Sequence, residues 1–368
     1  CQGTLLWRYS LLFFSKMFEF EAPYTLYYIS YHNDSREYGT MTGTFRHTIG
    51  YLTNDLHLDY NCSLQEGVIA TCREIGYRTL SFLGGELKSP NFTQSIRNNL
   101  YGFVNSQSVD GLIINAGTIF HYVNKDEVEE FYRQFEGIPI VNIGKKVLSY
   151  PSILVDNKEG LRNGIRHLIK DHGRRRIVFI KGPATSHESE ERFAAYCEVL
   201  EEYDIHFDPY LVKQGNFDMR SGAMALAGLL IDKIEFDAIV AANDDMALGA
   251  LGRAHEAGIS VPEECSFMGF DDITGARNCS VPLTTVRQPF ALMARNATLL
   301  LRDYIENEKP ESDILLPTQL MIRKSCGCFP ESVIKAGINP AITQNGNLSS
   351  SKEELISALE SASASSSL

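Results

Sequence analysis

Three features are missing from this 368-residue sequence: a long apolar run, an excess of positive charge and a recognisable catalytic motif. A membrane helix needs about 18 or more consecutive apolar residues, and the nearest candidate, residues 5–18, is interrupted by Arg8 and Lys16. The 34 Lys and Arg residues against 46 Asp and Glu residues give a net charge of −12. That balance argues against coating nucleic acid or an anionic membrane by charge alone. We therefore expect no membrane contact.

The missing catalytic motifs belong to several enzyme classes. The sequence has no Gly-x-Ser-x-Gly elbow, no Gly-x-x-x-x-Gly-Lys-Ser/Thr phosphate loop, no Gly-x-Gly-x-x-Gly fingerprint and no His-Glu-x-x-His zinc motif. His187-Glu188 lacks a second His four residues later. Asp271-Asp272 could act as an acid–base pair, but holding a ligand is the simpler role. We expect no catalytic residue, no cofactor and no enzymatic activity.

The eight Cys residues are scattered, which is typical of a large protein in the reducing cytosol rather than of a disulfide scaffold. We therefore expect a cytoplasmic location. Cys326-Gly-Cys328 is the only close pair. A metal site would need further Cys or His ligands, and none lies at a suitable spacing along the chain. We expect two free thiols here and no metal site.

What is present is an ordinary globular composition, with 44% hydrophobic and 22% charged residues. Short apolar runs alternate with longer segments of helical period, which predicts βαβ units and parallel sheets. We expect strands at residues 48–52, 79–83, 111–114, 138–143, 177–180, 210–213, 238–242 and 266–270. We expect helices at residues 63–75, 92–105, 125–135, 160–170, 189–203, 220–231 and 245–257.

The two halves of this pattern share one plan, so the predicted fold class is α/β with two tandem Rossmann-like lobes and a ligand cleft between them. In open α/β sheets the ligand lies beyond the carboxyl ends of the strands. Residues 1–45 form an aromatic-rich segment without a clean period, and the tail at 329–368 is polar and Ser-rich. The expected N-terminal lobe comprises residues 46–157 plus about 289–315, and the C-terminal lobe comprises residues 158–288 plus about 316–328.

Polar residues gather where the predicted strands end. The second half offers Asn243-Asp244-Asp245 and Asp271-Asp272, with Arg192 inside a helix and Phe217 as an aromatic residue. Amides and carboxylates pair with hydroxyls, Arg bonds two oxygens at once, and an aromatic face stacks on a sugar or a base. These residues predict a site for a neutral polar ring. Helix capping is the alternative role of such Asn and Asp residues, and we expect it for Asp59, Asn157 and Asp245.

Nine short motifs occur in an order that resembles the effector-binding core of the lactose-repressor/galactose-repressor (LacI/GalR) family, which is itself similar to periplasmic sugar-binding proteins. The resemblance covers residues 46 to about 328. Each motif alone is weak, and the signal lies in their order and spacing. They are Thr48-Ile-Gly-Tyr-Leu, Val109-Asp-Gly-Leu-Ile-Ile-Asn115, Val155-Asp-Asn157, His172-Gly173, Gly182-Pro183 with Arg192, Ala242-Asn-Asp-Asp-Met-Ala-Leu-Gly249, Val261-Pro262, Gly269-Phe-Asp-Asp272 and Pro282-Leu-Thr-Thr-Val-Arg-Gln-Pro289.

The resemblance implies ligand-contacting roles for seven positions. Arg192 matches the Arg that holds ligand oxygens, and Phe217 matches the aromatic residue that stacks on the ring. The full set is Tyr60, Asn115, Arg192, Phe217, Asn243, Asp271 and Gln288. The segment before Arg192 departs from purine-sensing members, since Ser186, Glu188 and Glu191 favour a hydroxylated ligand.

The resemblance implies a transcriptional regulator that senses a small effector, a sugar, and works as a homodimer. Residues 1–45 carry three basic against four acidic residues and no helix-turn-helix pattern, so DNA would be bound only through a domain not visible in this chain. Two alternatives stay open: a sensor module of a larger signalling protein, and a transport-type solute-binding protein.

Overall fold

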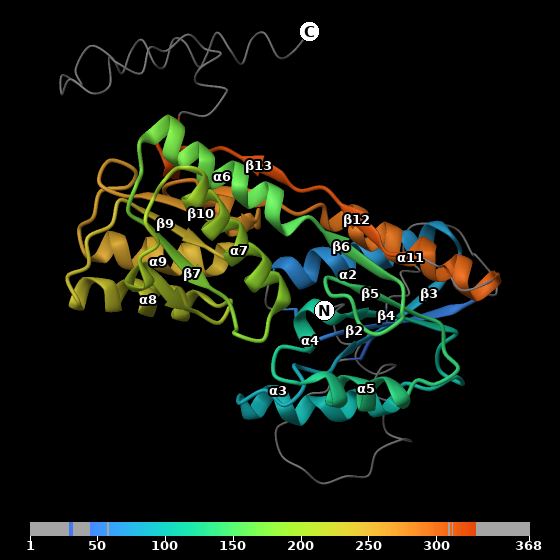
Figure 1. The fold of residues 1–368 in the computed structure, drawn as a ribbon. Helices are drawn as coiled ribbons and strands as arrows, with labels where there is room; N and C mark the ends of the chain where they lie inside the picture. The colour runs from blue at the N-terminus through green and yellow to red at the C-terminus, as the bar shows by residue number, and fades with distance from the viewer. Residues whose placement is uncertain (1–28, 32–44, 57–58, 308–309, 311, 329–368) are drawn as a thin grey trace, which may run out of the picture.

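The computed structural model describes residues 29–31, 45–56, 59–307, 310 and 312–328 (Figure 1). The predicted tail at 329–368 and most of the predicted segment at 1–45 lie outside these residues. No helix in the described ranges combines the length and the apolar character that crossing a membrane would require.

The first sheet, in the N-terminal lobe, has seven strands. They are β1 (Ile29–Tyr31), β2 (Thr48–Thr53), β3 (Arg78–Leu83), β4 (Gly111–Asn115), β5 (Ile140–Ile143), β6 (Ser152–Val155) and β12 (Ile314–Leu316). Their order is β1-β3-β2-β4-β5-β6-β12, and all neighbours are parallel except β1, which pairs antiparallel with β3. Three residues of the segment expected to stand apart from the lobes thus form an edge strand of this sheet.

The second sheet, in the C-terminal lobe, has six strands. They are β7 (Ile177–Lys181), β8 (Val212–Gln214), β9 (Ala238–Ala241), β10 (Ser266–Asp271), β11 (Thr284–Arg287) and β13 (Gln319–Met321). Their order is β13-β11-β10-β9-β7-β8, and only β13 is antiparallel to its neighbour. Two mostly parallel sheets in one chain confirm the predicted α/β fold class.

Helices cover both faces of each sheet. In the N-terminal lobe they are α2 (Asp59–Glu74), α3 (Phe92–Ile96), the 3-10 helix η1 (Arg97–Phe103), α4 (Ala116–Ile119), α5 (Lys125–Arg133) and α11 (Phe290–Glu306). In the C-terminal lobe they are α6 (Asn157–His172), α7 (His187–Glu202), η2 (Pro209–Leu211), α8 (Met219–Ile231), α9 (Asp244–Glu256), α10 (Thr274–Asn278) and η3 (Lys324–Cys326). Figure 1 shows α8 and α9 against one side of the second sheet and α6 and α7 against the other.

The central strands are apolar on both faces because each face has its own core. In β4, Leu112 and Ile114 pack with the residues of α5 and η1, whereas Ile113 between them packs with α2 and α11. All five residues of this strand are buried. A strand covered on two sides has no solvent-facing positions, so it reads as a continuous apolar run.

The chain crosses between the lobes three times. The crossings follow β6, β11 and β12, since α6, α11 and β13 each belong to the lobe opposite the strand before them. Three short connections between two rigid sheets allow a hinge motion that opens and closes the space between the lobes. This arrangement places the carboxyl ends of both sheets at one cleft.

Candidate functional site

A cavity of about 350 Å³ lies in the cleft between the lobes. It is lined by residues that follow β3, β4 and β5 on one side and β8, β9 and β10 on the other. Six of the seven predicted site residues line it, namely Tyr60, Arg192, Phe217, Asn243, Asp271 and Gln288. The volume lies within the range of small-molecule sites, roughly 300–1,000 Å³.

Arg192 supplies the positive charge of the cleft. It lies in the second turn of α7 and is 4% exposed. Its Nε donates to Asn157 Oδ1 at 3.0 Å, its Nη1 donates to the Ala242 carbonyl at 2.6 Å, and the guanidinium lies 3.7 Å from the ring centre of Phe270. Nη2 has no hydrogen-bond partner among the described residues. Burial lowers the pKa of Arg192 from its usual value. An oxygen-bearing ligand in the cavity would give Nη2 a hydrogen-bond partner.

Asp271 ends β10 and is 6% exposed. Its Oδ1 accepts a hydrogen bond of 2.6 Å from Gln288 Nε2, and its backbone carbonyl accepts from the Gln288 amide at 3.3 Å. Burial raises the pKa of Asp271 well above its usual range, against the opposing effect of the nearby Arg192 charge. The backbone of Asp271 has a φ of 124°. The loop that follows holds the carboxyl group in the cavity, where its second oxygen can accept a hydrogen bond from a ligand.

Phe217 lies in the loop between β8 and α8 with a φ of 62°. Its ring lies directly over Gly182, where a Cβ would come within 2.3 Å of the ring. Asn243 fixes this loop, because its Nδ2 donates to the Phe217 carbonyl at 3.0 Å while its Oδ1 caps α9 at the Met246 amide. Asn243 therefore positions the aromatic ring, and a direct contact with a ligand stays a prediction.

Asn115 is the predicted residue that does not line the cavity. It ends β4, is fully buried, and donates through Nδ2 to Asn61 Oδ1 at 2.9 Å and to Thr53 Oγ1 at 3.4 Å. Asn61 in turn donates to Asn54 Oδ1 at 2.7 Å, and Asn54 is a cavity residue. Asn115 thus supports the cavity wall from behind through one intervening amide.

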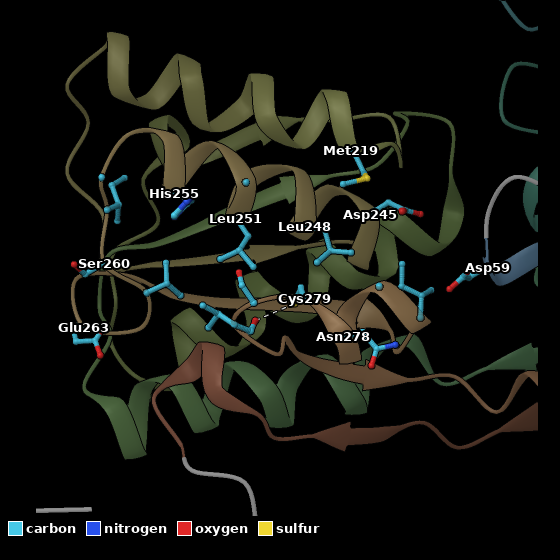
Figure 2. Close-up of a pocket in the computed structure, with 18 residues that line it drawn as sticks. Asp59, Met219, Asp245, Leu248, Leu251, His255, Ser260, Glu263, Asn278 and Cys279 are labelled. Atoms are coloured by element: carbon cyan, nitrogen blue, oxygen red, sulfur yellow. Dashed lines mark hydrogen bonds between the residues drawn. The ribbon is translucent and has the colours of Figure 1, made fainter. Parts of the chain in front are cut away.

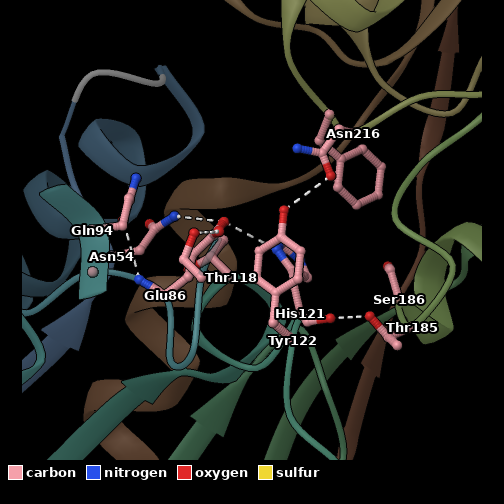
Figure 3. A network of polar contacts seen from close by, with 12 residues as sticks. Asn54, Glu86, Gln94, Thr118, His121, Tyr122, Thr185, Ser186 and Asn216 are labelled. Atoms are coloured by element: carbon pink, nitrogen blue, oxygen red, sulfur yellow. Dashed lines mark hydrogen bonds and ion pairs between the residues drawn. The ribbon is translucent and has the colours of Figure 1, made fainter. Parts of the chain in front are cut away.

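Sequence reasoning missed most of the N-terminal side of the cavity. Glu86 accepts a hydrogen bond from Asn54 at 3.4 Å and lies 3.2 Å from His121 Nδ1 (Figure 3). Gln94 accepts from the Glu86 amide at 3.1 Å and donates to Asp55 at 3.1 Å. Glu86 follows the Gly84-Gly85 turn after β3, so the strand-end pattern could have found it. His121 lies in a loop that no strand or helix period marks.

Three contacts bridge the two lobes at the mouth of the cavity (Figure 3). Tyr122 donates to Asn216 Oδ1 at 3.0 Å, and Thr185 donates to the His121 carbonyl. The His121 and Phe217 rings have centroids 5.7 Å apart. These contacts join loops that would separate if the lobes opened, so the conformation described here is a closed one.

Three residues that were expected to favour a hydroxylated ligand have different surroundings. Glu188 lines the cavity. Ser186 instead caps α7 by accepting from the Ser189 amide at 3.2 Å, and Glu191 accepts from Asn157 at 2.8 Å outside the cavity. Only Glu188 of the three is placed to act on a ligand directly.

The comparisons with known proteins agree with this geometry. Residues 165–326 match the family model described as a periplasmic binding protein-like domain. The chain is 34% identical over 232 residues to the HTH-type transcriptional regulator CelR of Thermobifida fusca and 33% identical over 226 residues to the transcriptional repressor CytR of Escherichia coli. Over this region the chain is thus similar to HTH-type transcriptional regulators. The matched region is 61% of this chain and 66% and 65% of those relatives, just under two thirds of each.

Solved structures of the LacI/GalR family share the two-lobe fold. A CelR–cellobiose complex matches with a TM-score of 0.65 and 29% identity, covering 76% of this chain and 84% of that one. The Escherichia coli repressor AscG matches with a TM-score of 0.60 and 26% identity, covering 77% and 99%. A lac repressor dimer bound to operator, at 24% identity and a TM-score of 0.63, adds support for the fold alone.

A second, larger cavity of about 970 Å³ lies along α9 on the C-terminal lobe (Figure 2). Leu248 and Leu251 occupy its middle, with Asp59 and Asp245 toward one end and Glu263 toward the other. Its polar groups are thus spread apart rather than aimed at one point, and a specific small-ligand site needs converging donors and acceptors. The cleft cavity is the better candidate site.

Two of the expected helix caps are wrong. Asp156, not Asn157, caps α6, since its carboxylate accepts from the amides of Lys158 and Glu159 at 3.0 Å. Asn243, not Asp245, caps α9. In each case the cap lies one or two residues before the expected residue. Asn157 instead accepts a hydrogen bond from Arg192, and Asp245 lies in the cavity wall. For Asp59, the carboxylate accepts from the Thr274 amide of the opposite lobe at 2.9 Å.

Replacing Asp245 by Asn is expected to stabilise the protein by about 1–2 kcal/mol at pH 8. Burial, with the nearby charges of Asp59 and Asp218, raises the pKa of Asp245 from 3.8 to about 6. A carboxyl with a raised pKa favours folding while it is protonated, and that contribution is lost as the pH rises through about 6. The gain should therefore vanish near pH 4. Urea unfolding at both pH values measures it.

Asp126→Asn is the matched control for that experiment, because Asp126 also lies in the first turn of a helix but is exposed. Its effect should stay within about 0.5 kcal/mol at either pH. A loss of stability in Asp245→Asn at pH 8, or an equal gain at both pH values, would contradict the assigned burial cost.

The expectation that Cys326 and Cys328 have no His or Cys neighbours is wrong. The fold brings His167 and His172 of α6 within 3.4–3.5 Å of their sulfur atoms, from 156 to 161 positions earlier in the chain. No spacing along the sequence predicts such a pairing, because it depends on how β13 returns beside α6.

Proposed function

We propose that this chain is the ligand-sensing core of a transcriptional regulator and that its cleft binds a small hydroxylated ligand, a sugar. The observation that carries the proposal is the buried Arg192, whose Nη2 has no described protein partner in a cavity that also holds Asp271 and Phe217. A cation, a carboxylate and an aromatic ring are the set that holds hydroxyl pairs and the apolar face of a sugar ring. The cellobiose named in the CelR structure supports a sugar as the ligand class.

A neutral ligand fits this cavity better than an anionic one. The acidic side chains of Asp271 and Glu188 act on Arg192 and offset its positive charge. Further acidic residues, Glu86, Asp55, Asp218 and Asp245, line the same cavity. A phosphate group would meet this excess of negative charge in a space of low dielectric constant. We infer that sugars bind in preference to sugar phosphates.

The proposal also includes how ligand binding would act on a homodimer and on DNA, and where in the cell the protein works. Ligand binding would hold the lobes closed and alter the arrangement of a homodimer, as a population shift between open and closed lobes. The exposed apolar residues Met224 and Ile231 on α8 offer a surface that a second copy could cover. DNA would be contacted through a domain beyond the described residues. None of the seven described Cys residues is in a disulfide, which suits the cytoplasm.

We also propose that the cleft holds its ligand without chemical change. Asp271 is bonded to Gln288 and lies beside Arg192, an arrangement that orients a ligand and offers no nucleophile with an attached base. Recovery of the bound ligand unchanged after prolonged incubation with the protein would support this part of the proposal. Conversion of the ligand would contradict it.

The test of the proposed function is thermal unfolding of the full chain with a panel of neutral mono- and disaccharides, sugar phosphates, polyols and nucleobases. A ligand at about 100 times its dissociation constant stabilises the folded state by about 2.7 kcal/mol. We expect the largest increase in Tm with a neutral sugar. A response only to sugar phosphates or only to nucleobases would contradict the assignment of the ligand class.

A further inference from the structure

Four potential metal ligands meet at the end of α6 that is remote from the cleft. His167 and His172 lie in the last two turns of this helix, Cys326 ends η3, and Cys328 follows two residues later. The ligand atoms of the four side chains all lie within 4.8 Å of one another. Cys326 is fully buried, and the His167 side chain is 9% exposed.

Four of the six distances between the ligand atoms match a tetrahedral site. With metal–nitrogen bonds of about 2.0–2.1 Å and metal–sulfur bonds of about 2.3 Å, a tetrahedron separates two nitrogens by about 3.3 Å and a nitrogen from a sulfur by about 3.5 Å. The His167 and His172 Nε2 atoms are 3.2 Å apart. The Sγ of Cys326 lies 3.4 Å from His167 Nε2, and the Sγ of Cys328 lies 3.5 Å and 3.4 Å from the two imidazoles.

Two neighbouring residues, Asp171 and Gly327, help to orient the four ligands. Asp171 Oδ2 lies 2.5 Å from His167 Nδ1, which fixes the imidazole with Nε2 toward the sulfur atoms. Gly327, between the two Cys residues, has a φ of 113°, and a Cβ there would lie 2.9 Å from His172 Nδ1. A carboxylate behind a ligating His orients the ring and raises its basicity. The glycine lets both sulfur atoms face the same point.

We propose that His167, His172, Cys326 and Cys328 bind one Zn²⁺ ion in a closed, structural site. Two thiolates and two imidazoles in tetrahedral array are the ligand set that zinc prefers. With four protein ligands the ion has no open position for a substrate. The cleft lies at the opposite end of α6, where Asn157 contacts Arg192, at a distance of roughly 20 Å along a 16-residue helix. The zinc ion therefore fastens residues 326–328 to α6 and takes no part in ligand binding.

The first test is the metal content of the full chain, purified under reducing conditions with zinc present and any affinity tag removed. We expect about one equivalent of zinc per chain. After removal of the zinc, addition of Co²⁺ should give the visible absorption of tetrahedral cobalt with thiolate ligands. A protein that retains no zinc and gives no such spectrum would overturn the proposal, leaving a hydrogen-bonded thiol–imidazole group.

Variants at Cys328 locate the ion. Cys328→Ser should lose the bound zinc, whereas Cys328→His, which restores a zinc ligand, should retain it. Cys197→Ser is the matched control, since Cys197 is half-buried in α7 and away from the group. A chelator should lower the Tm of the wild type and of Cys197→Ser and leave that of Cys328→Ser unchanged. Zinc retained in full by Cys328→Ser would place the ion elsewhere and contradict the site.

Discussion

Replacing Arg192 by Met is expected to lower the affinity of the cleft for its sugar by about 100-fold or more. Hydrogen bonds to a charged group contribute about 1.5–3 kcal/mol each, and every 1.4 kcal/mol is a tenfold change in affinity. Met is similar in length and apolar, so it can pack on the Phe270 ring, over which the Arg192 guanidinium now lies. The loss is therefore one of charge and donors rather than of volume. Isothermal titration calorimetry with the most stabilising sugar of the panel measures it.

Arg166→Met is the control for this variant. Arg166 lies on the surface of α6, pairs with Glu202 at 2.7 Å, and carries the same charge as Arg192. An exposed pair of this kind contributes about 0–1 kcal/mol to folding, and this one does not line the cleft cavity. Its variant should bind the sugar with unchanged affinity. Equal affinity of the wild type and Arg192→Met for the sugar would show that Arg192 does not contact the ligand and would contradict the assigned site.

Replacing Asp272 by Asn is expected to cost about 3 kcal/mol of folding stability. Asp272 is fully buried and forms ion pairs with Arg277 at 3.3 Å, Arg287 at 2.6 Å and Arg323. Breaking a buried pair by removing one partner costs about 3–5 kcal/mol. The lower end applies because Arg277 and Arg287 reach solvent and recover hydration. Asn tolerates the φ of 63° at this position, so the variant tests charge and not backbone strain. Urea unfolding at pH 7 measures the loss.

Asp303→Asn is the comparison for this substitution. Asp303 pairs with Arg302 at 2.7 Å on the surface, where both side chains are at least one third exposed. Its loss should change stability by less than about 0.5 kcal/mol. A cost below about 1 kcal/mol for Asp272→Asn would mean that the three arginines do not depend on this carboxylate. The Asp272 cluster also sets the position of Asp271, so the variant should weaken sugar binding as well.

The strands could be predicted because parallel, doubly covered strands read as unbroken apolar runs. All eight expected strands are present, with ends that differ by up to two residues. The helix expected at 92–105 divides into α3 and η1, since Asn98 uses its side chain to bond the carbonyls of Gly84 and Glu86. Helix α11 was not predicted. Its N-cap is Pro289, which makes no side-chain capping bond, so the usual start signal is missing.

The site could be predicted only where its residues follow strands or carry the family resemblance. Asp271 ends β10 and Asn243 lies two residues after β9, and the structure places both in the cavity wall. His121 and Tyr122 come from a loop whose path is set by tertiary packing, so no local pattern marked them. His167 and Cys326 are 159 positions apart, and their meeting depends on the second sheet being complete. Long-range juxtapositions of this kind are not encoded in local periodicity.

Hydrogen–deuterium exchange of the full chain, with and without the most stabilising sugar, tests most directly whether the ligand binds between the lobes. We predict slower exchange on both sides of the cleft, at residues 86–94 and 117–122 of the N-terminal lobe and at residues 182–192 and 215–219 of the C-terminal lobe. The cavity along α9 should be unaffected around His255, Ser260 and Asn278. Protection confined to those last residues, with none on the N-terminal lobe, would contradict the cleft as the binding site.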